Sequence, residues 1–424
     1  MKKMIIILNT LLIIVVIAGC EREIISNAAT EVPVIGEEVP VAKEKLPEIS
    51  AEAPPWKIAI ITNDEESHHA AEALATRFGE HRVMHRSVPL AFGWIDWHPI
   101  IQEIVEDSDV KAIVSADALF LEATIDELMA MREDIFVVYA APQSHPVLSD
   151  VDIVEQLNLV IQTNDQIIGE LLVMQAIAMG AETIAHYSFY RHLRVPWIAE
   201  RLDLMRNTTE KAGIRFVELD ARDPMYKNRF DTIAHIEQDL PNQAKELGVN
   251  TAFFGTSCVM QSAIIAQVMA TGAIFVQPCC LSPYHGYPVG LGLEYGTYMD
   301  NTYLSIEDNP EADLMGLGAL VVSMDDAVAA GNMSGRISGW GVPANMMWTT
   351  IGFLYAVEWI SGNVPQEHGV ICLDTLDRLA RQFAAEFGLD CGITLDTLAL
   401  DGNTVSHYVL ATMDYRVFGQ VSMR

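Results

Sequence analysis

Residues 159–188, LVIQTNDQIIGELLVMQAIAMGAETIAHYS, contain two short apolar runs on either side of a segment with helical periodicity. The first run stops at Thr163, Asn164 and Asp165, whose side chains can accept hydrogen bonds from the unpaired amides of a helix's first turn. Apolar residues then recur at the spacing of one helix face up to Gly180, a residue type that commonly ends helices. The pattern predicts a strand, a polar turn, a helix and a second strand, which is one unit of an α/β fold.

The chain on both sides of this unit repeats the alternation of apolar strands and amphipathic helices. Continuous apolar runs such as residues 57–62 are typical of parallel strands that are buried on both faces. We therefore predict an α/β fold of two doubly wound parallel-sheet lobes joined by a hinge that the chain crosses more than once. Residues 143–155, rich in turn formers, are predicted to be the first crossing, and residues 405–412 an edge strand.

A family resemblance is carried by the strand ending at Asn164 and Asp165, by Gly169 and Gly180, and by the helix predicted at residues 196–213. This succession resembles the lobe-crossing region of type I periplasmic binding proteins and of LacI-type repressor effector domains. The likeness extends over residues 57–362, and the chain is more closely similar to a family of uncharacterised bacterial lipoproteins of that fold. The resemblance implies the architecture called periplasmic binding protein-like I, and it does not imply a substrate.

The N-terminus predicts the compartment. Two lysines precede a nearly continuous aliphatic run, which ends in the sequence IAGC at residues 17–20. That ending resembles a lipobox, in which the cysteine, here Cys20, carries a diacylglycerol that anchors the mature chain to a membrane. We expect an extracytoplasmic, lipid-anchored protein, because the apolar run is short for a bilayer-spanning helix.

The composition sets further limits on partners. With 424 residues, 50% of them hydrophobic, the chain can form two domains with substantial cores. The formal net charge of −31 argues against a nucleic-acid partner, because binding a polyanion depends on clustered Lys and Arg. Residues 21–55 carry repeated prolines and acidic residues, and we interpret them as an extended tether.

The predicted divisions of the chain follow from these patterns. They are a signal peptide (1–20), the tether (21–55), an N-terminal lobe (56–155), a C-terminal lobe (156–287), a return crossing that completes the N-terminal lobe (288–341), and C-terminal helices with a strand that complete the lobes (342–424).

Candidate ligand-binding residues lie where the predicted strands end, because the carboxyl ends of parallel strands form the ligand-binding edge of doubly wound sheets. Hydroxyl, amide, charged and aromatic side chains gather there, which suits a small polar ligand. Each polar residue alone can equally be a helix cap. The set is Thr62, Asn63, Asp64, Trp94, Ser115, Asp117, Pro142, Tyr187, Tyr190, Arg191, His192, Thr256, Ser257 and Gln277.

Arg191, His192 and Arg194 form a cationic group in an acidic chain. Since arginine can hold a carboxylate or phosphate through paired hydrogen bonds, they favour a ligand with an anionic group. The alternative is that these arginines pair with local carboxylates such as Glu200.

The cysteines other than Cys20 are odd in number, which leaves at least one thiol unpaired. Cys372 and Cys391 flank a predicted helix and are candidates for pairing. Cys258, Cys279 and Cys280 lie near strand ends, with His285 close in sequence. A metal site is conceivable there, but the spacing matches no recognised zinc pattern, so we favour buried thiols and assign no metal.

No catalytic signature is present: the chain has no Gly-x-Ser-x-Gly elbow, no phosphate loop and no His-Glu-x-x-His helix. We therefore expect a solute-binding lipoprotein that closes on a small molecule for a permease or a membrane sensor, with no enzyme activity and no cofactor. The alternatives are a surface enzyme that uses His68, Asp64 or His192 in the same cleft, and a lipoprotein that only binds another protein.

Overall fold

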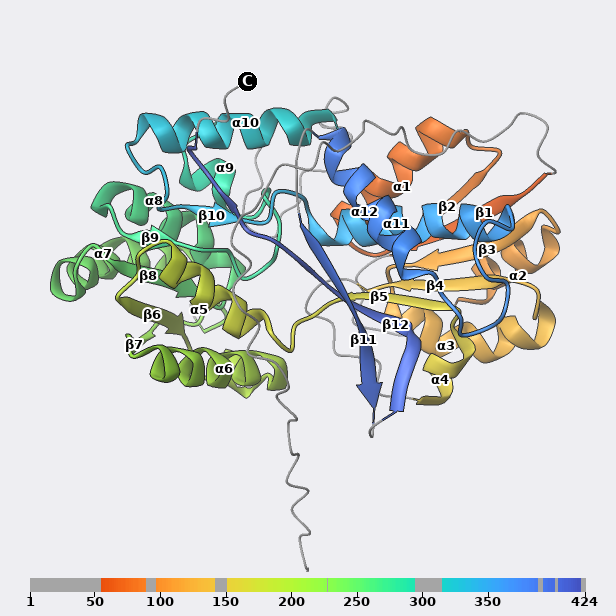
Figure 1. Ribbon diagram of the computed structural model, residues 1–424, viewed down its shortest axis with the longest axis horizontal. Helices are drawn as coiled ribbons and strands as arrows, with labels where there is room; N and C mark the ends of the chain where they lie inside the picture. Colours follow the sequence, from red (N-terminus) through yellow and green to blue (C-terminus); the bar gives the residue numbers. More distant parts are fainter. Residues whose placement is uncertain are drawn as a thin grey trace, which may run out of the picture. The chain divides into compact units, whose positions relative to one another are not determined.

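The computed structural model describes residues 55–88, 97–141, 151–226, 228–293, 315–387, 392–400 and 403–420. These residues form two doubly wound sheets, each with helices packed on both of its faces (Figure 1). The predicted α/β fold with parallel sheets is therefore confirmed. The signal peptide and tether predicted at residues 1–55 lie outside the described residues, except for Pro55.

The first sheet has the strand order β11-β12-β5-β4-β3-β1-β2. Its neighbouring strands pair in parallel except β11, which runs antiparallel to β12. The strands are β1 (Lys57–Thr62), β2 (Val83–Ser87), β3 (Val110–Ser115), β4 (Phe136–Ala140), β5 (Leu159–Thr163), β11 (Ile393–Leu400) and β12 (Asn403–Met413).

Alternate side chains of these strands enter two separate cores, because successive residues of a strand point to opposite faces. Ile58 and Ile60 pack with α1 (Glu65–Phe78), α11 (Ala344–Ile360) and α12 (Leu373–Glu386). Ala59 and Ile61 pack on the other face, which is covered by α2 (His98–Glu106), α3 (Ala118–Met131) and α4 (Val151–Gln156). Coverage of both faces accounts for the continuous apolar runs in the sequence.

The second sheet is parallel, with the order β7-β6-β8-β9. Helices α5 and α6 cover one face, and α7 and α8 cover the other. Its elements are α5 (Ile168–Ala178), β6 (Thr183–Ser188), α6 (Pro196–Ala212), β7 (Arg215–Asp220), α7 (Arg229–Leu247), β8 (Thr251–Gly255), α8 (Gln261–Thr271) and β9 (Ile274–Phe275). Short 3₁₀ turns stand at His192–Arg194 and Cys258–Met260.

The remaining described elements follow β9. These are α9 (Tyr287–Gly290), α10 (Met315–Ala330), β10 (Ser338–Gly339) and β13 (Arg416–Val417). Ile337 forms a parallel bridge with Phe275, and β10 pairs with β13. β10 and β13 form a small sheet of their own, and the bridge at Ile337 places its start beside β9.

The structure corrects two of the predicted assignments. Strand β5 pairs with β4, so the first sheet extends past residue 155 and the chain leaves it only after Thr163, not at residues 143–155. The strand predicted at residues 405–412 is internal, between β5 and β11, and the edge strand is β11. Periodicity identifies a strand, but its partners are chosen by contacts remote in sequence.

The organising helix begins later than predicted. Helix α5 starts at Ile168, and no side chain caps it, because residues 165–167 form a separate turn after β5. Its predicted end is accurate: Gly180 follows in the left-handed conformation, with φ of +88°.

Gly169 allows close packing of α5 against α6. A Cβ atom placed there would lie 2.6 Å from the carbonyl oxygen of Arg201. We predict that Gly169→Ala lowers the free energy of unfolding by about 1–3 kcal/mol, because backbone atoms of α6 must move to admit a methyl group. Denaturant unfolding measures the loss, and Glu170→Ala, on the exposed side of the same helix, should change stability by less than about 0.5 kcal/mol. A neutral Gly169→Ala variant would contradict the close helix contact.

Helix α11 is buried along nearly its whole length and packs against α1, β3, β4 and β5. Over the described ranges, no helix has both the length and the apolar character needed to cross a bilayer.

Candidate functional site

Polar residues after β1 and β3 lie together, as the strand order requires. Asn63 Nδ2 donates a hydrogen bond to Asp117 Oδ2 over 2.8 Å. Asp117 also accepts from the backbone N–H of Phe120 and so caps α3, while its own N–H donates to Ser115 Oγ. Asp117 is therefore a helix cap, the alternative to ligand binding that the sequence left open, and it also joins Asn63 and Ser115 in one cluster.

The start of α1 presents several acceptors. Asp64 caps the helix by accepting from the N–H of Ser67 over 3.1 Å, and Asn345 Nδ2 donates to the same oxygen over 3.2 Å. The second oxygen, Asp64 Oδ2, is buried without a hydrogen-bond partner among the described residues, as are Glu65 Oε2 and Ser67 Oγ. The Thr62 hydroxyl, at the end of β1, forms a hydrogen bond with His85, whose Nε2 lies 2.9 Å from Thr62 Oγ1.

A corresponding cluster of polar residues follows β6 and β8 in the second sheet. Ser188 Oγ lies 2.9 Å from Thr256 Oγ1, and His192 Nδ1 lies 3.2 Å from the same hydroxyl. Burial lowers the pKa of His192, and the charge of Arg191 lowers it further, so the ring is neutral near pH 7. Ser257 is also buried here, next to Thr256.

Three other candidates have different surroundings. Tyr187 is fully buried and donates its hydroxyl hydrogen to Asp239 in α7 over 2.8 Å, so it belongs to the core. Tyr190 is 77% exposed. Gln277 is buried and accepts a hydrogen bond from Tyr415. Trp94, Pro142 and Cys20 lie outside the described residues.

Arg191 does not present a free cation. Its Nε and Nη2 donate to both oxygens of Asp223 over 2.9 and 2.8 Å. Arg191 therefore pairs with a nearby carboxylate, as in the alternative to ligand binding, although its partner is Asp223 and not Glu200. Arg191 gives no support to an anionic ligand.

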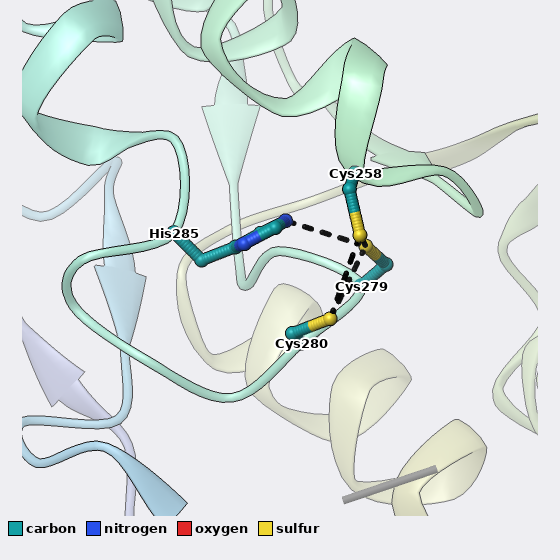
Figure 2. Close-up of side chains that lie close together, drawn as sticks. All are labelled: Cys258, Cys279, Cys280 and His285. Carbon is teal, nitrogen blue, oxygen red and sulfur yellow. Dashed lines mark hydrogen bonds between the residues drawn. The ribbon is translucent and has the colours of Figure 1, made fainter. Parts of the chain in front are cut away.

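Three cysteines and a histidine converge beside the second-sheet cluster (Figure 2). The Cys258 sulfur lies 3.6 Å from that of Cys279 and 3.7 Å from that of Cys280, and the latter two are 3.8 Å apart. His285 Nε2 lies 3.6 Å from Cys279 Sγ. All four ligand atoms fall within 4.8 Å of one another. The four atoms are close enough for one metal ion to contact them, a proximity that their spacing in the sequence did not indicate.

The sulfurs and the imidazole influence one another's ionisation. Hydrogen bonds from Cys279 and Cys280 hold the pKa of Cys258 well below its usual value. Burial alone would lower the pKa of His285, but the neighbouring Cys258 and Cys279 outweigh burial and raise it. The arrangement favours a thiolate at Cys258, the form in which cysteine binds metals.

Glu66 connects this region with the first sheet. Burial raises its pKa to about 7, against a side-chain hydrogen bond with Ser282 that lowers it. Ser282 lies between Cys280 and His285, and the His285 ring also acts on Glu66 electrostatically. The strand ends of the two sheets therefore meet through this contact.

A separate pocket of about 530 Å³ lies along β2 and α1. Four of its charged lining residues form two ion pairs, Lys57 with Asp107 and Arg86 with Glu103. None of the predicted ligand residues lines it.

Two doubly wound sheets with polar groups at their carboxyl ends define a two-lobed α/β protein. Within this class, the chain belongs to the family described as "Protein of unknown function (DUF3798)", which matches residues 56–318.

Other similar proteins include an uncharacterized protein of Treponema pallidum (strain Nichols), which is 24% identical over 202 residues, 46% of this chain and 88% of that protein. The crystal structure of a putative transcriptional regulator from Clostridium difficile 630 is similar with a TM-score of 0.70 and 19% identity, over 86% of this chain and all of that one. A periplasmic ribose ABC transporter structure from Conexibacter woesei gives a TM-score of 0.44 at 13% identity, over 78% and 97% of the two chains. The similarity to the Clostridium difficile structure supports the α/β fold inferred from the sequence.

Proposed function

We propose that this protein is an extracytoplasmic solute-binding lipoprotein, anchored through Cys20, that closes on a small polar molecule for uptake or sensing. Binding without catalysis fits the strand-end residues, whose polar groups are arranged as hydrogen-bond acceptors and helix caps. A ligand that prefers the closed form would shift the population toward it, and a permease or membrane sensor would then recognise that form.

One observation carries the proposal. Buried polar atoms at the carboxyl ends of β1 and β5 have no hydrogen-bond partner among the described residues, namely Asp64 Oδ2, Glu65 Oε2, Ser67 Oγ and Asn164 Oδ1. Buried polar groups are rarely left unpaired, because each one costs free energy. A solute that donates hydrogen bonds through hydroxyl or amine groups would satisfy them.

The ligand should be identified first. Mass spectrometry of small molecules released from the denatured protein, followed by a thermal-shift screen of sugars, nucleosides, amino acids and carboxylates, should find a compound that raises Tm. We expect polyhydroxylated or amine-bearing compounds to give the largest shifts. If nothing is released and no compound in the screen raises Tm, the proposal is wrong.

Asp64→Asn then tests the site with that compound. Asparagine caps helices as well as aspartate does, so stability should be retained while the second carboxylate oxygen is lost as an acceptor. We expect ligand affinity to fall about 10- to 100-fold, which isothermal titration calorimetry can measure. Asn228→Asp is the matched control, because Asn228 caps α7 in the same way. Unchanged affinity in Asp64→Asn would exclude this residue from the site.

A further inference from the structure

The cysteine and histidine group has the dimensions of a single tetrahedral metal centre. With Zn–S bonds of about 2.3 Å and a Zn–N bond of about 2.0–2.1 Å, tetrahedral angles place two sulfurs about 3.8 Å apart and a sulfur and a nitrogen about 3.6 Å apart. The observed sulfur separations are 3.6, 3.7 and 3.8 Å, and the Cys279 Sγ to His285 Nε2 distance is 3.6 Å. The three sulfurs are therefore spaced as around one ion, and since all four ligand atoms lie within 4.8 Å of one another, a shift of the His285 ring would complete the tetrahedron.

Other chemistry fits these distances less well. A disulfide requires sulfurs about 2.0 Å apart, and no pair in the group approaches that distance. An iron–sulfur cluster distributes its cysteines over several iron atoms, so its cysteine sulfurs cannot all surround one point. Ca²⁺ and Mg²⁺ prefer oxygen ligands, whereas thiolate and imidazole together select zinc and similar soft ions.

We propose that Cys258, Cys279, Cys280 and His285 form a four-coordinate binding site for one zinc ion. With four protein ligands the site is closed, which is the arrangement of structural rather than catalytic zinc. The ion would join the loop after β8, which carries Cys258, to the loop after β9, which carries the other three ligands. This inference is independent of the proposed solute-binding function.

The loops that carry the ligands are held in place by other contacts. Gln261 Nε2 donates to the carbonyl oxygens of Gly255 and Ser257 over 2.9 and 2.7 Å, which fixes the turn before Cys258. The N–H of His285 donates to the carbonyl of Ser282 over 3.1 Å. Gly286, next to His285, has φ of +82°, and a Cβ there would lie 2.6 Å from that of Gln261. The backbone is thus arranged for the ligands before any ion binds.

Charged groups around the site also fit a metal with thiolates. Three thiolates and Zn²⁺ leave one net negative charge, which needs a neighbouring cation. Arg201 is buried, its Nε and Nη2 have no hydrogen-bond partner among the described residues, and Cys279 and Cys280 act on it electrostatically. The Glu66 carboxyl also interacts electrostatically with His285, and carboxylates commonly orient histidines that bind metals.

Metal titration of the wild-type protein tests the site without any variant. The chain is purified under reducing conditions, stripped with a chelator and titrated with Zn²⁺ against a chromophoric chelator. We expect one tightly bound ion per chain and a rise in Tm. Co²⁺ should give thiolate charge-transfer bands and the intense visible bands of tetrahedral coordination. Weak zinc binding, or an octahedral cobalt spectrum, would overturn the proposal.

Single substitutions then identify the ligands. Cys258→Ser and His285→Ala should each lower zinc affinity at least about 100-fold, because each removes one of four ligands. Cys372→Ser is the matched control, since Cys372 is a free thiol outside the group, and it should bind zinc as the wild type does. Circular dichroism of the metal-free variants checks that they remain folded. An equal loss in Cys372→Ser, or no loss in Cys258→Ser, would contradict the assignment.

Discussion

Replacing Trp348 with alanine should lower the free energy of unfolding by about 3–5 kcal/mol. The side chain is fully buried in α11, which packs against β3, β4 and β5 of the first sheet. Its Nε1 also donates a hydrogen bond to Thr163 Oγ1 over 3.1 Å, at the end of β5. The substitution would leave a large cavity and an unpaired hydroxyl. Urea denaturation followed by circular dichroism measures the loss.

Trp348→Phe separates the two contributions. Phenylalanine retains much of the ring volume and loses the N–H donor, so we expect a cost of about 1–2 kcal/mol. A loss below about 1 kcal/mol for Trp348→Ala would mean that α11 does not supply the core of the first sheet as described.

The second large effect is a loss of stability in acid that depends on His186. This residue is 1% exposed, and its ring stacks on Phe254 with centroids 5.7 Å apart. Burial lowers the pKa of His186 to about 3, and the charges of Arg201 and Arg206 act in the same direction. The folded protein therefore keeps this ring neutral in weak acid, whereas the unfolded chain protonates it below about pH 6.5.

The sign of the effect follows from proton binding. Between about pH 6.5 and pH 3 the unfolded chain binds the extra proton, so this group makes the free energy of unfolding fall as pH falls. From pH 7 to pH 4 its contribution is on the order of 3 kcal/mol. Above pH 7 the His186 ring is neutral in both states, so it should add nothing to the pH dependence of stability.

His186→Phe is the informative variant, because a phenylalanine retains the stacking and cannot be protonated. We expect its stability to fall less steeply than that of the wild type between pH 7 and pH 4, measured by urea denaturation at each pH. Carboxylates titrate in both proteins and cancel in the difference. Parallel curves for the two proteins would show that His186 is not held neutral by burial.

The sequence predicted the individual strands and helices better than it predicted which strands pair with each other. The apolar run at β5 and Gly180 after α5 were identified from local signals, which short-range periodicity and conformational preference supply. The same signals could not show that β5 pairs with β4 and β12, because that choice depends on contacts far apart in the chain. The polar run after β5 was read as a helix start, whereas it forms a turn before Ile168.

The candidate site was predicted in part for similar reasons. Asn63 and Asp117 were expected together because they follow strands, and they hydrogen-bond once β1 and β3 pair. Tyr187 was placed at the strand end by its position, but its side chain faces α7. Cys258 and Cys279 are separated by a helix and a strand, and the pairing of β8 with β9 brings their loops together. The sequence did offer a signal for this cluster: Cys258, Cys279 and Cys280 follow predicted strands, and His285 is close to them in the sequence.

The short link between β12 and β13 has a consequence for how this chain can be divided. Only Asp414 and Tyr415 separate a strand of the first sheet from the strand that pairs with β10 beside the second. The first sheet is assembled from stretches before α5 and after β10, so a single cut cannot release either half as a continuous polypeptide. Exchange of one half between homologous genes would need several simultaneous junctions, which favours inheritance of the two halves as one unit.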